Sequence, residues 1–346
     1  MAFFVQSSFQ AKGIRSLSWR GIELVDWVSG GRAFATDGTE RPAKRLYGYR
    51  FDAATASPDG RYAVIYERLG TKGLLLHDGH IVRELDRSFN FADTYEYPIA
   101  LFNDADGRVL LAHCPGDHRR VELEEAETGR PLTASVERNP SDFFHSRLAA
   151  SPRGKRLLSA GWVWHPLNVV AWFDIAKALT DPHHLDNSDA LPHSFNPGRI
   201  EESSACWLDD DCMAVATSAE PEQDDVEDDG GPQLCPRGLA VYDLSKRVCL
   251  LAFQFDEPPG TILALGKRYV LSLYRHPKLI DLSTGKIVHI WTELQSGLQD
   301  GSITWGPDDD AKPPPMAFDA TGRRFAIVNG DTVTVIAFDH SELGSE

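Results

Sequence analysis

The chain has 346 residues, of which 35 are basic and 51 acidic, and its formal net charge at neutral pH is −16. This charge disfavours binding to nucleic acid or to an anionic membrane, and it favours a protein partner that is neutral or basic. The five cysteines are odd in number and have no C-x-x-C spacing, so neither a disulfide framework nor a zinc site is expected.

The N-terminal residues 1–10 contain no basic region, no sustained apolar stretch and no recognisable cleavage site. No later segment is long and apolar enough to suggest a membrane span. Free cysteines fit a reducing compartment. We therefore expect a cytoplasmic protein that does not insert into a membrane.

A short phrase recurs along the chain: a small apolar strand, a turn rich in Pro, Asp and Gly, a basic residue, and a second apolar strand. Clear copies occupy residues 54–65, 100–111, 148–158 and 316–328, and degenerate copies occupy residues 205–216 and 262–273. Gly60, Gly107 and Gly154 are spaced 47 residues apart. Proline presets φ at the first turn position and glycine supplies the positive φ that closes a hairpin. The phrase therefore predicts six hairpins.

A second hairpin follows most of the first ones. It is expected at residues 73–82, 120–132, 239–251 and 278–290, and a segment of the same shape occupies residues 23–35. Two hairpins in each repeat predict a four-stranded blade, and the repeat interval is typical of a β-propeller.

The last repeat offers three strands, at residues 316–318, 323–328 and 332–338. Residues 3–9 are a suitable fourth strand, because pairing there would hide a sheet edge that is otherwise open to aggregation. We expect an all-β fold, a single propeller domain over residues 1–346, with seven four-stranded antiparallel blades and a ring closed by the N-terminal strand. Six or eight blades are the alternatives. Two insertions interrupt the repeats, near residues 174–199 and 219–236.

These S-P-D-G hairpins, as at residues 57–60, resemble those of the WD-repeat superfamily in its broad sense, especially bacterial propellers. The resemblance covers nearly the whole chain but lacks a repeated Trp-Asp dipeptide and a regular Gly-His pair. It is a likeness of fold and carries no specific activity. It implies a rigid platform for protein partners, with a minority of enzymes and ligand sensors among propellers.

The first insertion carries residue types that could bind a divalent metal. These are His183, His184 and His193 with Asp181, Asp186 and Asp189. Their spacing matches no metal motif, and adjacent histidines cannot easily turn toward one ion. We therefore expect a solvated polar loop and no metal, with the three histidines as weak candidates.

The second insertion is strongly acidic. Its carboxylates are Asp224, Asp225, Glu227, Asp228 and Asp229. Crowded like charges with neighbouring Gly and Pro do not pack, so a mobile loop is one interpretation. The others are a contact surface for a basic partner and a weak calcium ligand set, although the run lacks the D-x-D-x-D-G order of a calcium loop.

Aromatic residues gather at Trp162, Trp164 and the neighbouring His165. Exposed tryptophan is typical of binding hot spots. Packing between blades also uses large aromatic rings, and we expect it for at least two of Trp162, Trp164 and Trp172. Both interpretations stay open for this segment.

No G-x-S-x-G, H-E-x-x-H, P-loop or G-x-G-x-x-G motif is present. The sequence therefore favours a non-enzymatic, protein-binding scaffold without a cofactor, which docks a partner through a rim or face of the ring. The alternative is a small-molecule enzyme or ligand sensor, similar to propeller lactonases or hydrolases, with its site at the central channel. A structural module of a larger assembly is a third interpretation.

Overall fold

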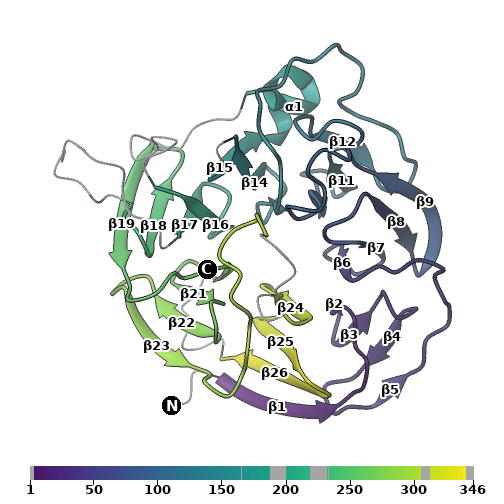
Figure 1. Cartoon of the computed structure of the whole chain (residues 1–346), viewed down its shortest axis with the longest axis vertical. Coiled ribbons are helices and arrows are strands. Elements are labelled where there is room, and N and C mark those ends of the chain that lie inside the picture. The colour runs from purple at the N-terminus through teal and green to yellow at the C-terminus, as the bar shows by residue number, and fades with distance from the viewer. Residues whose placement is uncertain are drawn as a thin grey trace.

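The computed structural model describes residues 4–164, 166–187, 200–218, 232, 234–304 and 312–339. Its strands form seven antiparallel sheets, which are arranged around a central axis as the blades of a propeller (Figure 1). Five sheets have four strands and two have three. The predicted all-β propeller with seven blades is confirmed.

Blades 1 to 4 follow one another along the chain, and each starts with its innermost strand (Figure 1). Blade 1 contains β2 (Ser18–Arg20), β3 (Glu23–Asp26), β4 (Arg32–Phe34) and β5 (Glu40–Arg41), and blade 2 contains β6 (Ala53–Ala56), β7 (Tyr62–Tyr66), β8 (Lys72–His77) and β9 (His80–Asp86). Blade 3 contains β10 (Ile99–Asn103), β11 (Val109–His113) and β12 (Glu122–Glu125), and blade 4 contains β13 (Leu148–Ala150), β14 (Arg156–Val163) and β15 (Leu167–Asp174).

Blades 5 to 7 complete the ring. Blade 5 contains β16 (Glu202–Trp207), β17 (Cys212–Thr217), β18 (Gly238–Asp243) and β19 (Val248–Gln254), and blade 6 contains β20 (Ile262–Leu265), β21 (Tyr269–Ser272), β22 (Lys278–Asp281) and β23 (Lys286–Ile290). Blade 7 contains β24 (Met316–Asp319), β25 (Arg324–Asn329), β26 (Thr332–Phe338) and, outermost, β1 (Phe4–Gln10).

The N-terminal strand closes the ring, as predicted. β1 pairs antiparallel with β26, from Phe4 opposite Phe338 to Gln10 opposite Thr332. This pairing satisfies the outer edge of β26 and ties the two ends of the described chain into one sheet.

The predicted hairpin phrase forms the two inner strands of six blades. These are β6–β7, β10–β11, β13–β14, β16–β17, β20–β21 and β24–β25. In blade 2 the Gly60 N–H donates to the Ser57 carbonyl at 2.8 Å, and in blade 4 Gly154 donates to Ser151 at the same distance. Both glycines have a positive φ. This conformation costs little energy in a residue that has no Cβ.

The core lies between the blades. Successive side chains of a strand point to opposite faces, so a central strand contacts both neighbouring blades. In β7, Ile65 packs in a buried cluster with Trp27 of blade 1. The adjacent Val64 packs in a cluster with Leu101 of blade 3. Among the described residues, seven such clusters join the seven pairs of neighbouring blades.

Blade 1 is built differently from the sequence-based expectation. The hairpin expected on its outside at residues 23–35 forms the two middle strands, β3 and β4. The reason is a tight turn at Gly21, whose φ is +56°, which leaves only Ser18–Arg20 for the inner strand.

Blades 3 and 4 have three strands within the described residues. In blade 3 the outer strand expected near residue 130 is reduced to a single bridge between Glu124 and Pro131. Proline has no N–H to continue a ladder, which explains the loss. In blade 4 the chain leaves β15 directly into the helix α1 (Ile175–Thr180), where the Asp174 carboxylate accepts from the Lys177 N–H at 3.0 Å.

The first insertion therefore begins as folded structure, where a solvated loop was expected. After α1 comes the 3-10 helix η1 (Pro182–Leu185), in which Pro182 and Leu185 are buried. No helix in the described ranges is long and apolar enough to cross a lipid bilayer.

Candidate functional site at the mouth of the channel

The two faces of the ring differ in how the chain turns. Each inner strand starts at one face and runs to a short hairpin turn at the other. We call the face with these turns the turn face and the opposite one the loop face. At the loop face lie the residues just before the inner strands, among them Asp52, Glu96 and Arg147.

A segment of the connection between blades 6 and 7 crosses the loop face. This crossing segment, residues 296–304, starts on blade 6, where the Arg275 N–H donates to the Gly297 carbonyl at 2.7 Å. It ends against the entry to blade 3, where the Thr304 N–H donates to the Thr94 carbonyl, also at 2.7 Å. Figure 1 shows it passing over the centre of the ring. It therefore covers part of the centre of the loop face, which we call the channel mouth.

The crossing segment is held by a charged network around Glu96. The Glu96 carboxylate accepts from Arg147 Nε at 3.0 Å and lies 3.3 Å from Arg68 Nη1. Gln299 of the crossing segment donates to Glu96 at 2.6 Å and accepts from Arg68 at 2.9 Å. Gly301 passes so close to Asn168 of β15 that a Cβ would lie 2.6 Å from its Oδ1. These contacts fix the segment to blades 2, 3 and 4.

The protonation of Glu96 follows from this network. Burial alone would raise the pKa of Glu96, but Arg147, Arg68 and the Gln299 amide outweigh it and hold the pKa below its ordinary value. A carboxylate that is ionised and bonded on both oxygens is poorly suited to accept a substrate proton. We therefore assign Glu96 a positioning role for the crossing segment.

An aromatic cluster lies beside the network on the same face. Its members are Phe91, Tyr95, His118, Phe144, Trp162 and Trp164. Phe144 and Trp162 stack with ring centroids 3.8 Å apart, and His118 stacks on Phe144 at 4.0 Å. Ile303 of the crossing segment packs against the buried part of this cluster. Burial lowers the pKa of His118, so this ring is neutral near neutral pH.

Part of the cluster reaches solvent. Trp164 is 53% exposed and Phe91 is 41% exposed, whereas Trp162 is 2% exposed. Phe89, two residues before Phe91, is 85% exposed. The loop face thus carries exposed aromatic rings on a buried aromatic base.

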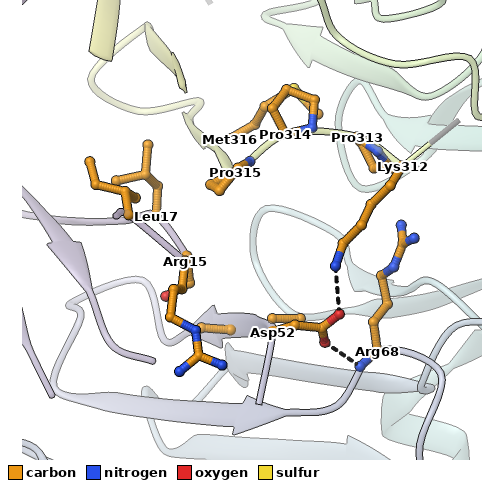
Figure 2. A pocket seen from close by; sticks show the side chains of 13 residues that line it. Arg15, Leu17, Asp52, Arg68, Lys312, Pro313, Pro314, Pro315 and Met316 are labelled. Atoms are coloured by element: carbon orange, nitrogen blue, oxygen red, sulfur yellow. Dashed lines mark hydrogen bonds and ion pairs between the residues drawn. The ribbon is translucent and has the colours of Figure 1, made fainter. Parts of the chain in front are cut away.

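A pocket opens on the other side of the channel mouth, between blades 7, 1 and 2. Its volume is about 560 Å³. Figure 2 shows Arg15 and Leu17 on one side, a run of prolines before Met316, and Lys312 reaching toward Asp52. The Lys312 ammonium lies 2.9 Å from the Asp52 carboxylate, which also accepts from the Arg68 N–H at 2.8 Å.

The tryptophan candidates are divided by the structure. Trp162 and Trp172 are buried, as expected for packing, although Trp162 packs within the loop-face cluster. Trp172 packs between blades 4 and 5. Trp164 offers an exposed ring, and His165 lies outside the described residues.

Two of the three histidine candidates, His183 and His184, lie within the described residues. The His183 ring lies 3.2 Å from Asp186, whose carboxylate also accepts from the buried Arg138. His184 is exposed, and His193 is outside the described ranges. Where residues are described, no group of three His, Cys, Asp or Glu side chains is placed to hold a metal.

The acidic candidates Asp224, Asp225, Glu227, Asp228 and Asp229 lie outside the described residues. The chain on either side of them is described. β17 ends and β18 begins at the loop face, where the Arg237 N–H donates to the Ser218 carbonyl at 2.7 Å. Ser218 and Arg237, which flank the acidic insertion, therefore lie at the face that carries the aromatic cluster.

The sequence analysis missed the charged network. Glu96, Arg68 and Gln299 come from three separate connections, and nothing local marks them. One signal was present: Asp52, Glu96 and Arg147 all stand just before an inner strand, at a similar phase of the repeat. Charged side chains at that phase converge on the channel mouth.

No protein-family model matches this chain, and no curated protein matches it in sequence. The structure shows the seven-bladed propeller fold, and membership of the WD-repeat superfamily stays a prediction.

Proposed function

We propose that this propeller is a non-enzymatic protein-binding scaffold that docks a partner on its loop face. The observation that carries the proposal is the exposure of Phe91 and Trp164 above the buried rings of the aromatic cluster. Tryptophan is enriched among residues that dominate binding energy. Rings held by buried neighbours lose little freedom on binding, so more of their contact energy remains as affinity.

The charge of the chain suggests the chemistry of the partner. A net charge of −16 attracts a basic surface and speeds its association. Ser218 and Arg237, which flank the second insertion, lie at the same face, and we propose that the carboxylates of the insertion contribute to the partner contact. A likeness to bacterial WD-repeat propellers and a cytoplasmic location are consistent with such a scaffold and stay predictions.

The alternative is a small-molecule enzyme or ligand sensor. The ion-paired state of Glu96 gives no support to a catalytic base at the mouth. The pocket beside Arg15 does support a ligand site, which is independent of docking on the aromatic cluster.

The test compares tagged wild-type protein with the variant Phe91→Ala/Trp164→Ala and with Ile22→Ala. Ile22 is 80% exposed in the turn between β2 and β3, on the turn face, and serves as the matched control. Proteins retained from the native extract at low and high salt are identified by mass spectrometry, and the purified partner is then titrated. We expect the double variant to bind at least about tenfold more weakly and Ile22→Ala to bind normally.

Equal binding by all three proteins would remove the aromatic cluster from the interface. Loss of binding at high salt with all three would support a basic partner. If the wild-type protein retains nothing, the scaffold proposal fails and the ligand-sensor alternative takes its place.

A further inference from the structure

The pocket between blades 7, 1 and 2 combines charge with an apolar wall. The charged residues of its lining are Arg15, Arg68, Lys312 and Asp52, so its own charge is positive in a strongly acidic protein. Its volume of about 560 Å³ lies in the range of small-molecule sites. We infer that this pocket binds a small organic carboxylate with an apolar body.

Arg15 is the anchor for the carboxylate. Its guanidinium donates to the Phe51 carbonyl, which uses one of five N–H donors. No carboxylate of the described residues forms an ion pair with it, whereas Arg68 pairs with Glu96 and Lys312 with Asp52. Arginine presents a planar fork that matches a carboxylate. An incoming carboxylate would supply the counter-charge that Arg15 lacks here.

Asp52 restricts the charge of the ligand. Its carboxylate forms an ion pair with Lys312 inside the pocket and repels a second anion. A dianion such as phosphate meets this repulsion with twice the charge of a carboxylate, and it offers no apolar group to the wall of the pocket. The site therefore favours a carboxylate with an apolar body over phosphate, and removal of Asp52 should strengthen binding.

The apolar wall accommodates the remainder of the ligand. Ile14, Leu17, Met316 and the prolines 313–315 line the pocket (Figure 2). Proline rings are rigid, so this wall is preformed and little entropy is lost when an apolar group packs on it. The inferred ligand thus has a carboxylate at one end and an apolar body at the other.

This inference does not rest on the docking proposal. The pocket residues belong to blades 1, 2 and 7 and the connections beside them, whereas the aromatic cluster belongs to the entries and turns of blades 3 and 4. A failure of one can therefore be told from a failure of the other.

The experiment is calorimetric titration of the full chain with 4-phenylbutyrate, with its neutral amide and with inorganic phosphate. We expect saturable binding of 4-phenylbutyrate with a dissociation constant below about 1 mM. The amide should bind at least about tenfold more weakly, since it lacks the charge that pairs with Arg15. Added salt should weaken the binding of 4-phenylbutyrate but not the binding of its amide.

Three variants sharpen the test. Arg15→Gln should lower the affinity for 4-phenylbutyrate at least about tenfold, and Asp52→Asn should raise it. Arg247→Gln is the matched control, because Arg247 is an exposed arginine in the β18–β19 turn, away from the pocket. Urea unfolding of each variant checks that the ring is intact.

The inference is overturned if 4-phenylbutyrate shows no saturable binding to the wild-type protein, if the amide binds equally well, or if phosphate binds more tightly. It is also overturned if Arg247→Gln weakens binding as much as Arg15→Gln, or if Asp52→Asn weakens it while the variant remains folded.

Discussion

The turn face and the loop face of this ring are held together by different kinds of contact. At the turn face the same short hairpin recurs, and a side chain reaches from one blade to the next. Arg156 of blade 4 donates to the Asp210 carbonyl of blade 5 at 2.7 Å. Arg324 of blade 7 donates to the Gly21 carbonyl of blade 1, also at 2.7 Å. This face is specified by the repeat itself.

The loop face carries contacts that the repeat does not specify. One of these contacts joins parts of the ring that are not neighbours: Gln299, between blades 6 and 7, binds Glu96 at the entry to blade 3. A rigid ring with one regular face leaves the other free to carry specific side chains. The repeat therefore indicates where the blades are, and the departures from it indicate where to seek function.

The largest effect is expected from a substitution that breaks the regular face. A Cβ on Gly154 would lie 2.0 Å from the Asn103 carbonyl oxygen of blade 3, and the glycine has a φ of +65°. Gly154→Ala should therefore lower the free energy of unfolding by at least about 3 kcal/mol, from the left-handed backbone and the overlap together. Urea unfolding measures this loss.

Gly107 is the matched control for Gly154. It occupies the corresponding turn of blade 3 with a φ of +78°, but no atom lies within 4 Å of the point that a Cβ would occupy. Gly107→Ala should cost only about 1–2 kcal/mol. Equal losses for the two variants would show that contacts between blades do not add to the strain of these turns.

The ring could be predicted because its signals are local. The turn from Ser57 to Gly60 is closed by residues adjacent in sequence, and the apolar strands on either side report burial on both faces. The missing outer strand of blade 3 could also have been expected, because Pro131 lies where a ladder would need an N–H. Blade 1 was harder, since the tight turn at Gly21 lacks the Pro-Asp pattern.

The candidate site could be predicted only in part. Trp164 stands out because aromatic residues are dense around it. Gln299 and Glu96 are 203 residues apart, and their contact exists only when the ring is closed and the crossing segment is laid over it. No pattern of spacing reports such a contact. Physical placement of the blades is needed first.

The next effect in size concerns the loop face. Glu96→Gln removes the charge that Arg68 and Arg147 share while keeping the shape of the side chain. We expect the free energy of unfolding at neutral pH to fall by about 2–3 kcal/mol, because two partly buried guanidiniums lose their counter-ion. Urea unfolding of Glu127→Gln, an exposed carboxylate in the β12 turn, should show a change within about 0.5 kcal/mol.

The pH dependence of the free energy of unfolding tests whether the charge of Glu96 stabilises the fold. The pKa of Glu96 in the folded state lies below its ordinary value of 4.5, so folding favours the ionised form. The stabilisation is therefore present above the ordinary pKa and is lost as the pH falls through the folded-state pKa. The difference between wild type and Glu96→Gln should shrink on acidification. A difference that stays constant with pH would show that the Glu96 charge is not its source.

Substitution of Glu202 is expected to give the smallest change in the free energy of unfolding, with a pH dependence opposite in sign to that of Glu96. It also stands at the start of an inner strand on the loop face, but among the described residues its carboxyl accepts only the Val170 N–H, at 2.9 Å. Burial without a cation raises the pKa of Glu202 well above its ordinary value of 4.5. Folding therefore favours the protonated form, and a cost appears as the pH rises above the ordinary pKa toward the folded-state pKa.

Glu202→Gln removes this titration and keeps an oxygen for the Val170 N–H. We expect the free energy of unfolding of the variant to exceed that of the wild type by about 0.5–2 kcal/mol at pH near 8. This difference should disappear as the pH falls below the ordinary pKa. Urea unfolding across that pH range measures the difference. A gain at low pH that vanishes at high pH would mean that Glu202 is ionised and paired, as Glu96 is. Both carboxylates lie near the start of an inner strand, so opposite slopes would show that contacts outside the repeat decide the chemistry of the loop face.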